Sequence, residues 1–218
     1  MNKEYEEVKM FHQTFGHPTS NVPVSLTKER ANKRYTWMLE EINEFLEAVK
    51  EQDIVEQADA MIDTIYFALG TLVEMGVQPD MLFRIVQKAN MSKLWADGKP
   101  HYNEMGKVIK PKGWENPHPK LQQAIKEMKN ENLIDESSVD YKIDYQFNEV
   151  KSFHKAFGHP TSIVPVSLTK ERASKRYAWM LEEINEFLEA VKEQDIVEQA
   201  DAMIDTIYFA LGTLVEMG

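Results

Sequence analysis

The stretch LEEINEFLEAVKEQDIVEQADAMIDTIYFALG, residues 39–70, decides the fold, and it returns without a change as residues 181–212. It contains two groups of acidic residues, each spaced so that its members share one face of a helix. The first group is Glu41 and Glu44, with Glu40 beside them, and the second is Glu56, Asp59 and Asp63. The chain therefore carries the same acidic pattern twice, on what we expect to be two helical hairpins.

Apolar side chains beside each acidic group recur at the three- and four-residue steps of a helix that packs in a bundle. On the first expected helix they are Ala31, Tyr35, Met38, Ile42, Phe45 and Val49. On the second they are Ala58, Ile62, Ile65, Leu69 and Leu72. If the helices pack antiparallel along these stripes, the acidic strips face one another near the bundle interior, where helix bundles build metal sites. The pattern predicts an all-α fold with a four-helix-bundle core.

The acidic groups are candidate ligands for a divalent cation. Carboxylates one helical turn apart repel each other, and a hard cation that prefers oxygen ligands offsets this repulsion. A solvated helix face is the alternative, and the apolar stripes that flank the acids favour the metal site. Glu56 has a competing structural role, because Asp53-x-x-Glu56 resembles a capping box at the start of its helix.

The second half of the chain is a copy of the first. Residues 11–76 and 153–218 match at 61 of 66 positions. The five differences are Gln13/Lys155, Thr14/Ala156, Asn21/Ile163, Asn32/Ser174 and Thr36/Ala178. The corresponding acids of the second copy are Glu183, Glu186, Glu198, Asp201 and Asp205. Two such copies predict either a pseudo-dimer within the chain, with approximate two-fold symmetry, or pairing with another chain in a homo-oligomer.

Composition narrows the class of protein. The chain has 218 residues, a formal net charge of −11 and no cysteine, so a disulfide framework and a thiolate metal site are excluded. We expect no nucleic-acid partner, because such a protein needs a basic face. The sequence has no long apolar run, and its first ten residues are too charged for a signal peptide. We therefore expect no membrane partner and a cytoplasmic location.

Around the two hairpins the chain is expected to form shorter elements. Residues 4–15 form a helix with Val8, Phe11 and Phe15 turned inward, and residues 79–95 and 120–130 form two more helices. The basic residues that open the second helix are expected to be solvated; they are Lys28, Arg30, Lys33 and Arg34. The predicted domains are a first repeat at 1–100, an arm, short helix and linker at 101–147, and a second repeat at 148–218. The second repeat lacks a fourth helix of its own.

At these residues the sequence resembles the MazG-like, all-α NTP pyrophosphohydrolase superfamily, which includes MazG, phosphoribosyl-ATP pyrophosphohydrolases and dimeric dUTPases. The signature ExxE followed by ExxD reads here as Glu41-Ile-Asn-Glu44 and Glu56-Gln-Ala-Asp59. The runs FHxxFGHP, DAMIDTIYFALGT and NMSKLWADGKP are also similar to one branch of it. In one point the chain departs from the pattern. The acid directly before the apolar run is Asp63, so Asp59 with Asp63 is the alternative second ligand pair.

The resemblance implies magnesium-dependent hydrolysis of a nucleoside triphosphate to the monophosphate and pyrophosphate, with Mn²⁺ as a substitute for Mg²⁺. It implies that the acids of both repeats hold the metal and that Glu40 or Glu41 orients or deprotonates a water molecule. Near the end of the fourth helix, Lys88, Asn90 and Lys93 would contact phosphate or sugar.

Two other functions are open. A helical module that senses nucleotides or binds a partner without catalysis would keep the same fold and the same acids. A di-iron carboxylate bundle would need Glu-x-x-His motifs, and the two hairpins have none.

Overall fold

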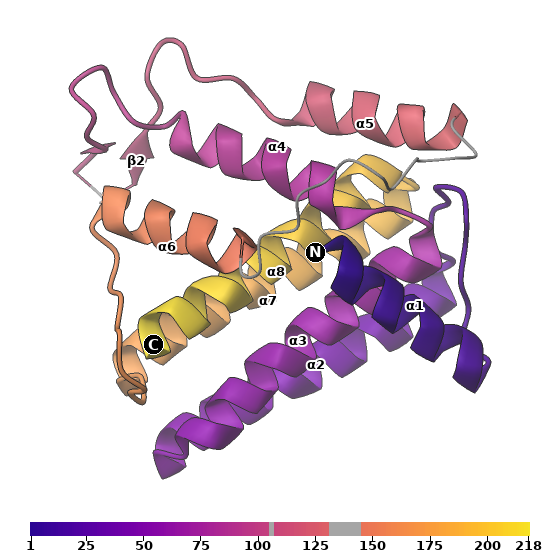
Figure 1. Ribbon diagram of the computed structural model, residues 1–218, viewed down its shortest axis with the longest axis horizontal. Helices are drawn as coiled ribbons and strands as arrows, with labels where there is room; N and C mark the ends of the chain where they lie inside the picture. The colour runs from indigo at the N-terminus through magenta and orange to yellow at the C-terminus, as the bar shows by residue number, and fades with distance from the viewer. Residues whose placement is uncertain (105–106, 131–144) are drawn as a thin grey trace.

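The computed structural model describes residues 1–104, 107–130 and 145–218. Within these ranges the chain forms eight helices and one short antiparallel pair of strands (Figure 1). The helices are α1 (Asn2–Phe15), α2 (Lys28–Glu51), α3 (Ile54–Met75), α4 (Pro79–Met91), α5 (His118–Asn130), α6 (Tyr145–Phe157), α7 (Lys170–Glu193) and α8 (Ile196–Met217). The strands are β1 (His101–Tyr102) and β2 (Val108–Ile109). The all-α prediction is confirmed, while the predicted linker at 131–142 lies outside the described residues.

Each long hairpin is closed by a short turn whose geometry comes from the sequence. At the end of α2 the backbone of Gln52 takes a left-handed φ of 60°, which ends the helix. Asp53 then caps α3, since its carboxylate accepts hydrogen bonds from the backbone N–H groups of Val55 and Glu56 at 3.0 and 3.2 Å. The second repeat has the same turn before α8. The predicted capping role of Asp53 is confirmed.

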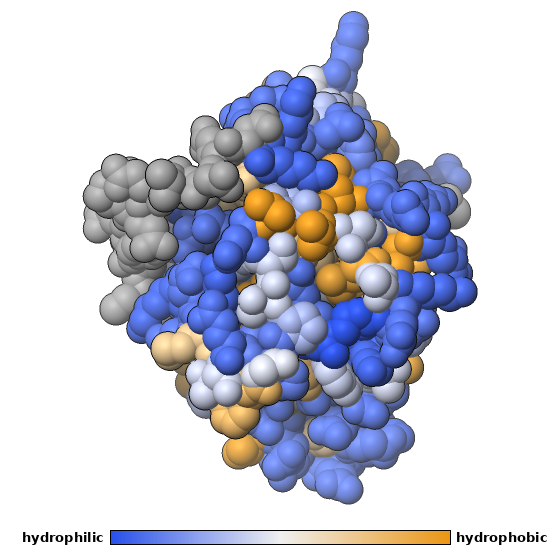
Figure 2. All heavy atoms as spheres, turned by 90° about the vertical axis from the view of Figure 1, so that its right-hand side faces the viewer, coloured by the Kyte–Doolittle hydropathy of each residue, from blue (hydrophilic) through white to orange (hydrophobic). Residues whose placement is uncertain are grey.

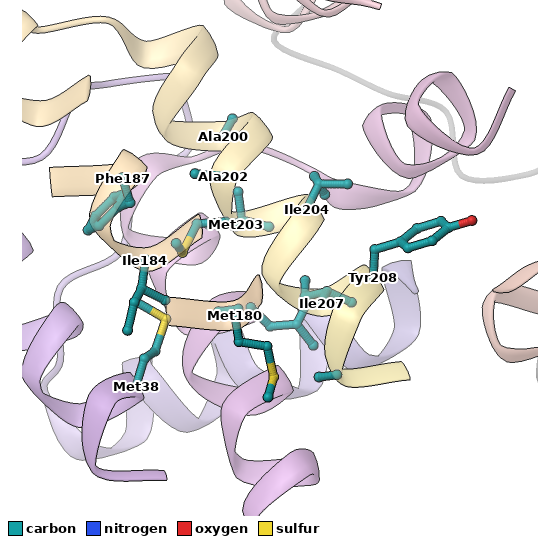
Figure 3. Packing of buried hydrophobic residues seen from close by; sticks show 14 of the residues in the cluster. Met38, Met180, Ile184, Phe187, Ala200, Ala202, Met203, Ile204, Ile207 and Tyr208 are labelled. Atoms are coloured by element: carbon teal, nitrogen blue, oxygen red, sulfur yellow. The ribbon is translucent and has the colours of Figure 1, made fainter. Parts of the chain in front are cut away.

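The four long helices form one bundle within the chain. Besides pairing within its own hairpin, α2 packs on α7 and α3 packs on α8. Met38 of α2 lies beside Met180 and Ile184 of α7 in the core, and all three are fully buried (Figure 3). The two repeats therefore form the internal pseudo-dimer that the duplicated stripes predict.

Two glutamines tie the repeats together at equivalent places. Gln57 of α3 is fully buried; its amide donates to the hydroxyl of Ser167 at 2.7 Å and accepts from the backbone N–H of Leu168 at 3.2 Å. Gln199 of α8 makes the same pair of bonds to the loop before α2. Each hairpin thus holds the entry loop of the other.

A buried charge network connects the two helices of each hairpin. Arg30 donates two hydrogen bonds of 2.6 Å to the buried carboxylate of Glu74, and Arg34 lies 3.4 Å from the same carboxylate. The guanidinium of Arg34 occupies the space beside Gly70, where a Cβ atom would overlap it and approach His12. The expectation that Arg30 and Arg34 are solvated is therefore wrong, because both are partners of a carboxylate inside the hairpin.

The fourth helix breaks the symmetry. Although α4 follows α3 after a three-residue connection, it crosses to the other hairpin and packs on α8, together with α5 (Figure 1). The side chains that α4 buries include Leu82, Phe83, Val86 and Gln87. Within the described residues the second repeat has no fourth helix of its own, as expected, and α4 of the first repeat packs on α8 in its place.

The first helix differs from its expected packing. Val8 is buried as expected, but Phe11 and Phe15 are exposed. Their rings instead contact each other, with centroids 4.5 Å apart, and Phe11 also meets Tyr66 edge to face. Helical periodicity alone assigned all three to the inner face, but beyond Val8 the side chain that α1 buries is His12, which lies beside Gly70 of α3.

The surface is mainly hydrophilic on the face shown in Figure 2, with a small apolar area near its centre. Within the described ranges, no single helix is long and apolar enough to cross a membrane. The helices α3 and α4 meet such a criterion only when taken together, and they are bent by 117° at their junction.

The cross-repeat glutamines generate a stability prediction. We expect Gln57→Ala to lower the free energy of unfolding by about 1–3 kcal/mol, because the part-buried N–H of Leu168 loses its acceptor. The measurement is urea unfolding followed by circular dichroism. Gln122→Ala, at an exposed position of α5, is the matched control and is expected to change little. Equal losses in the two variants would contradict the assigned role of Gln57.

Candidate active site

The acids of the second repeat lie together under α4 and α5. Glu183 and Glu186 come from α7, and Asp201 and Asp205 from α8. Burial is the largest cause that raises the pKa of Glu183, Asp201 and Asp205, and the neighbouring carboxylates raise it further. Such mutual effects mean that these carboxyl groups of α7 and α8 lie near one another.

Basic side chains approach these acids from α4 and the arm after it. Lys93 is half-buried and donates a hydrogen bond of 2.7 Å to Asn90. Burial lowers its pKa, the charge of Asp205 raises it, and the charge of Lys110 lowers it again. Lys110 itself lies over the ring of Trp114, 3.7 Å from the centroid. The site therefore has an acidic side on α7 and α8 and a basic side on α4 and the arm.

A histidine joins the acidic side from α5. The Nδ1 atom of His118 lies 2.7 Å from a carboxylate oxygen of Glu198, and its charge lowers the pKa of Asp201 against the effect of burial. His118 and Lys110 were not predicted. Both lie in the segment between residues 96 and 120, which has no periodicity from which to infer its position.

The first repeat gathers its acids in the same way but without such a cover. Burial, followed by the charges of Asp63, Glu44, Asp59 and Glu40, raises the pKa of Glu41 to about 7. Burial, followed by the charges of Asp59 and Glu44, also raises the pKa of Asp63. Asp59 is exposed, whereas its counterpart Asp201 is half-buried.

The two acids about which the sequence left a choice differ in position. Glu56 lies exposed in the first turn of α3, where Asp53 caps its N–H group. Asp63 lies deeper and acts electrostatically on Glu41. In the first repeat the geometry therefore favours Asp59 with Asp63. In the second, Glu198 also acts on Asp201 and Asp205.

The donor set suits a hard cation, although its oxygens are not yet arranged around one point. Among the described residues, no group of three or more His, Asp and Glu side chains is close enough to hold a metal ion. One carboxylate oxygen of this set, Oδ1 of Asp201, is nevertheless buried and has no hydrogen-bond partner. A buried carboxylate oxygen without a donor suits a cation, and carboxylates are the ligands that Mg²⁺ prefers.

The structure separates the three candidate substrate-binding residues, of which Lys88 and Asn90 lie in α4 and Lys93 in the turn after it. Asn90 and Lys93 belong to the side that faces α8, where Asn90 also hydrogen-bonds to Tyr208. Lys88 instead lines a cavity of about 510 Å³ between the outer face of α4 and the 113–120 segment, with Arg84 and Lys120. Lys88 lies within α4, whereas Lys93 lies in the turn that follows the last helical residue, Met91.

An aromatic pocket lies one helical turn from the acids of the first repeat. Its volume is about 220 Å³, and it is lined by Phe11, His12, His17, Arg34, Trp37, Tyr66 and Phe67. Trp37 precedes Glu41 by four residues and Tyr66 follows Asp63 by three, so rings and acids share a helix face. The second repeat keeps these ring contacts, with Trp179 stacked on Phe209 and Phe153 on His159.

A model of the phosphoribosyl-ATP pyrophosphohydrolase family matches residues 8–90 and, a second time, residues 150–218. The chain belongs to this family. Together the two segments cover more than half of the chain, and they confirm the resemblance to the MazG-like all-α superfamily. Membership in the phosphoribosyl-ATP pyrophosphohydrolase family makes the chain a member of a group of pyrophosphohydrolases. A comparison with curated proteins finds no match.

The crowded carboxyls generate a pH prediction for the metal-free protein. Because the pKa of Glu183 is raised in the folded state, the stability linked to its proton is present at acid pH and is lost as the pH rises through that pKa. We expect Glu183→Gln to raise Tm at pH 9 by about 2–4 °C relative to the unaltered chain and to change it little at pH 4.

Scanning calorimetry in the presence of a chelator would measure this difference. Glu193→Gln removes the same charge at an exposed position outside the acidic groups and is expected to leave Tm unchanged at both values of pH. A Tm gain of the same size in both variants would mean that net charge, and not the buried carboxyl, is responsible.

Proposed function

We propose that the chain is a metal-dependent nucleoside triphosphate pyrophosphohydrolase, which cleaves the α–β phosphoanhydride to give a nucleoside monophosphate and pyrophosphate. The observation that carries this proposal is the meeting of opposite charges at the second repeat. Asp201 and Asp205 supply an acidic side for a cation, and Lys93 and Lys110 a basic side for phosphate. Removal of non-canonical nucleotides from the nucleotide pool is a role that fits this activity.

The residues divide the chemistry among them. Glu186, Asp201 and Asp205 would hold Mg²⁺, or Mn²⁺ in its place; Glu198 would hold it once it is released from His118. Their counterparts in the first repeat are Glu44, Asp59, Asp63 and Glu56. When bound, the metal would neutralise the phosphate oxygens and lower the pKa of a bound water molecule.

Glu183 is the residue we assign to the attacking water. Its half-buried carboxylate, the counterpart of Glu41, is a stronger base than an exposed one because its pKa is raised. The water oxygen forms a bond to the α-phosphorus, its proton passes to Glu183, and the bond to the bridging oxygen breaks as pyrophosphate leaves. Lys93 and Lys110 would orient the phosphates and balance the charge on the leaving group.

The aromatic side chains beside the acids support a nucleoside substrate. Planar bases stack on such rings, and the pocket volume in the first repeat fits a ring system of that kind. Phosphoribosyl-ATP, which gives the family its name, carries the same triphosphate and belongs among the substrates to test.

The experiment that tests this function is hydrolysis of a panel of NTPs, dNTPs and phosphoribosyl-ATP with Mg²⁺ or Mn²⁺, with products separated by ion exchange. Monophosphate and pyrophosphate are the expected products. Diphosphate and inorganic phosphate would contradict the assigned bond cleavage. Nucleotide binding without turnover of any substrate would favour the alternative function, a helical module that senses nucleotides.

The two repeats are expected to contribute unequally to catalysis. We expect Asp201→Asn to lower kcat/KM by about 10²–10³-fold, as loss of one group that stabilises a transition state does. Asp59→Asn removes the counterpart in the uncovered first repeat, and we expect a clearly smaller loss. Steady-state kinetics of the two variants measures the difference. A larger loss in Asp59→Asn would place the activity in the first repeat and contradict this prediction.

The cations of α4 can be separated by a second pair of variants. We expect Lys93→Ala to lower kcat/KM by about tenfold or more, because a charge-assisted contact to phosphate is lost. Lys88→Ala, on the outer face of α4, is expected to stay within about twofold, as a charge far from the reacting groups should. Equal losses would mean that the net charge of α4 matters and not the position of Lys93.

A further inference from the structure

The helices α3 and α8 have the same sequence but different surroundings. Residues 54–76 and 196–218 are identical. On α8, Val197 and Ile204 are buried, with exposed fractions of 7% and 0%. On α3, their counterparts Val55 and Ile62 are 70% and 52% exposed. Since the side chains are the same, the difference arises from what covers them.

The cover on α8 consists of α4 and α5. Phe83 of α4 lies 5.7 Å from the ring of Tyr208, and Gln87 accepts a hydrogen bond of 2.6 Å from the Tyr208 hydroxyl. Tyr208 points away from the apolar cluster drawn in Figure 3, toward these partners. At the other end, α5 brings His118 to Glu198. The segment formed by α4 and α5 thus binds α8 through an aromatic contact, a hydrogen bond to an amide and an ionic contact.

Every one of these contact groups is present on α3. Tyr66, Glu56 and Asp63 stand where α8 has Tyr208, Glu198 and Asp205. Tyr66 is also oriented in the same way, because it meets Phe11 edge to face at 5.8 Å and 81°, and Tyr208 meets Phe153 at 5.7 Å and 80°. Figure 1 shows no helix over the N-terminal end of α3, and α4 and α5 lie on the side of α8.

We propose that the face of α3 formed by Val55, Ile62 and Tyr66 is a docking site for another polypeptide. The docking part of that polypeptide is a helical segment with the same contact side chains that α4 and α5 present to α8. Such a segment presents a Phe and a Gln four residues apart, then an Asn and a Lys. When seated on α3, it would bring its lysine to Asp63 and turn the acids of the first repeat into a second complete site. This last step rests on the proposed function; the docking does not.

A second copy of this chain does not meet the requirement. In the described ranges each chain offers two such faces, on α3 and α8, and carries one α4–α5 segment, which already covers α8. If two copies exchanged their segments, each face filled on one chain would be emptied on the other. An exchange of segments between copies therefore leaves the number of uncovered faces unchanged, and the proposed occupant is a polypeptide whose own segment is free.

The test titrates the full-length chain with a fluorescently labelled polypeptide of residues 77–130, followed by anisotropy and analytical ultracentrifugation. We expect saturable binding with one polypeptide per chain. Ile62→Lys is expected to weaken binding by tenfold or more, and because Ile62 is exposed, circular dichroism should show an unchanged fold. Ile163→Lys, at an 89% exposed position in a loop of the second repeat, is the matched control and should bind as the unaltered chain does.

Three outcomes would overturn the docking proposal. These are an absence of binding, binding that Ile62→Lys leaves unchanged because the polypeptide displaces α4 from α8, and self-association of the chain alone that Ile62→Lys abolishes. Turnover separates the docking from the proposed function. A gain in kcat on binding that Asp59→Asn removes supports the second site, and binding to an active chain without such a gain rules that site out. If the chain has no activity at all, the proposed function fails and the binding result still decides the docking.

Discussion

Each helical hairpin has an apolar stripe that its own two helices cannot cover, and the stripe of the other hairpin covers it. Met38 and Ile42 on one side, with Met180 and Ile184 on the other, are all fully buried by this packing. The remaining elements depend on it. The loops before α2 and α7 are held by a glutamine from the opposite repeat, and α4 finds its place on α8 because the two hairpins already lie side by side.

Much of this arrangement follows from local sequence. The steps of three and four residues place the acids on one face and the apolar stripe beside it, and the cap at Asp53 begins α3 where the sequence indicates. The pairing of the repeats also follows, because identical stripes have identical partners. These features depend on neighbours within one or two helical turns, which a sequence pattern records directly.

The features that the sequence did not reveal all depend on distant partners. Arg34 stands between the stripe positions Ala31 and Met38, yet its charge indicates solvent unless its partner, the buried carboxylate of Glu74, is known. The crossing of α4 to α8 leaves no periodic signal, because the same helix face would fit α3 equally well. His118 and Lys110 reach the acids through a segment of loops and two short strands, where no spacing rule applies. Lys88 was grouped with Lys93 by proximity along the chain, although Lys88 lines the outer cavity on α4 and Lys93 lies in the turn after that helix.

The pairing of repeats that are 142 residues apart also sets an order of events in time. At a synthesis rate of roughly 5–20 residues per second, the α2–α3 hairpin is complete about 7–28 seconds before α8. During that interval its apolar stripe has no native partner, and the loop that Gln199 will hold has no anchor. Long-range pairing of this kind also slows folding, because a long loop must close before its contacts form. The nascent first hairpin is therefore the stage at which this chain most depends on chaperones, and an identical hairpin on a neighbouring nascent chain is its nearest competitor for the native partner.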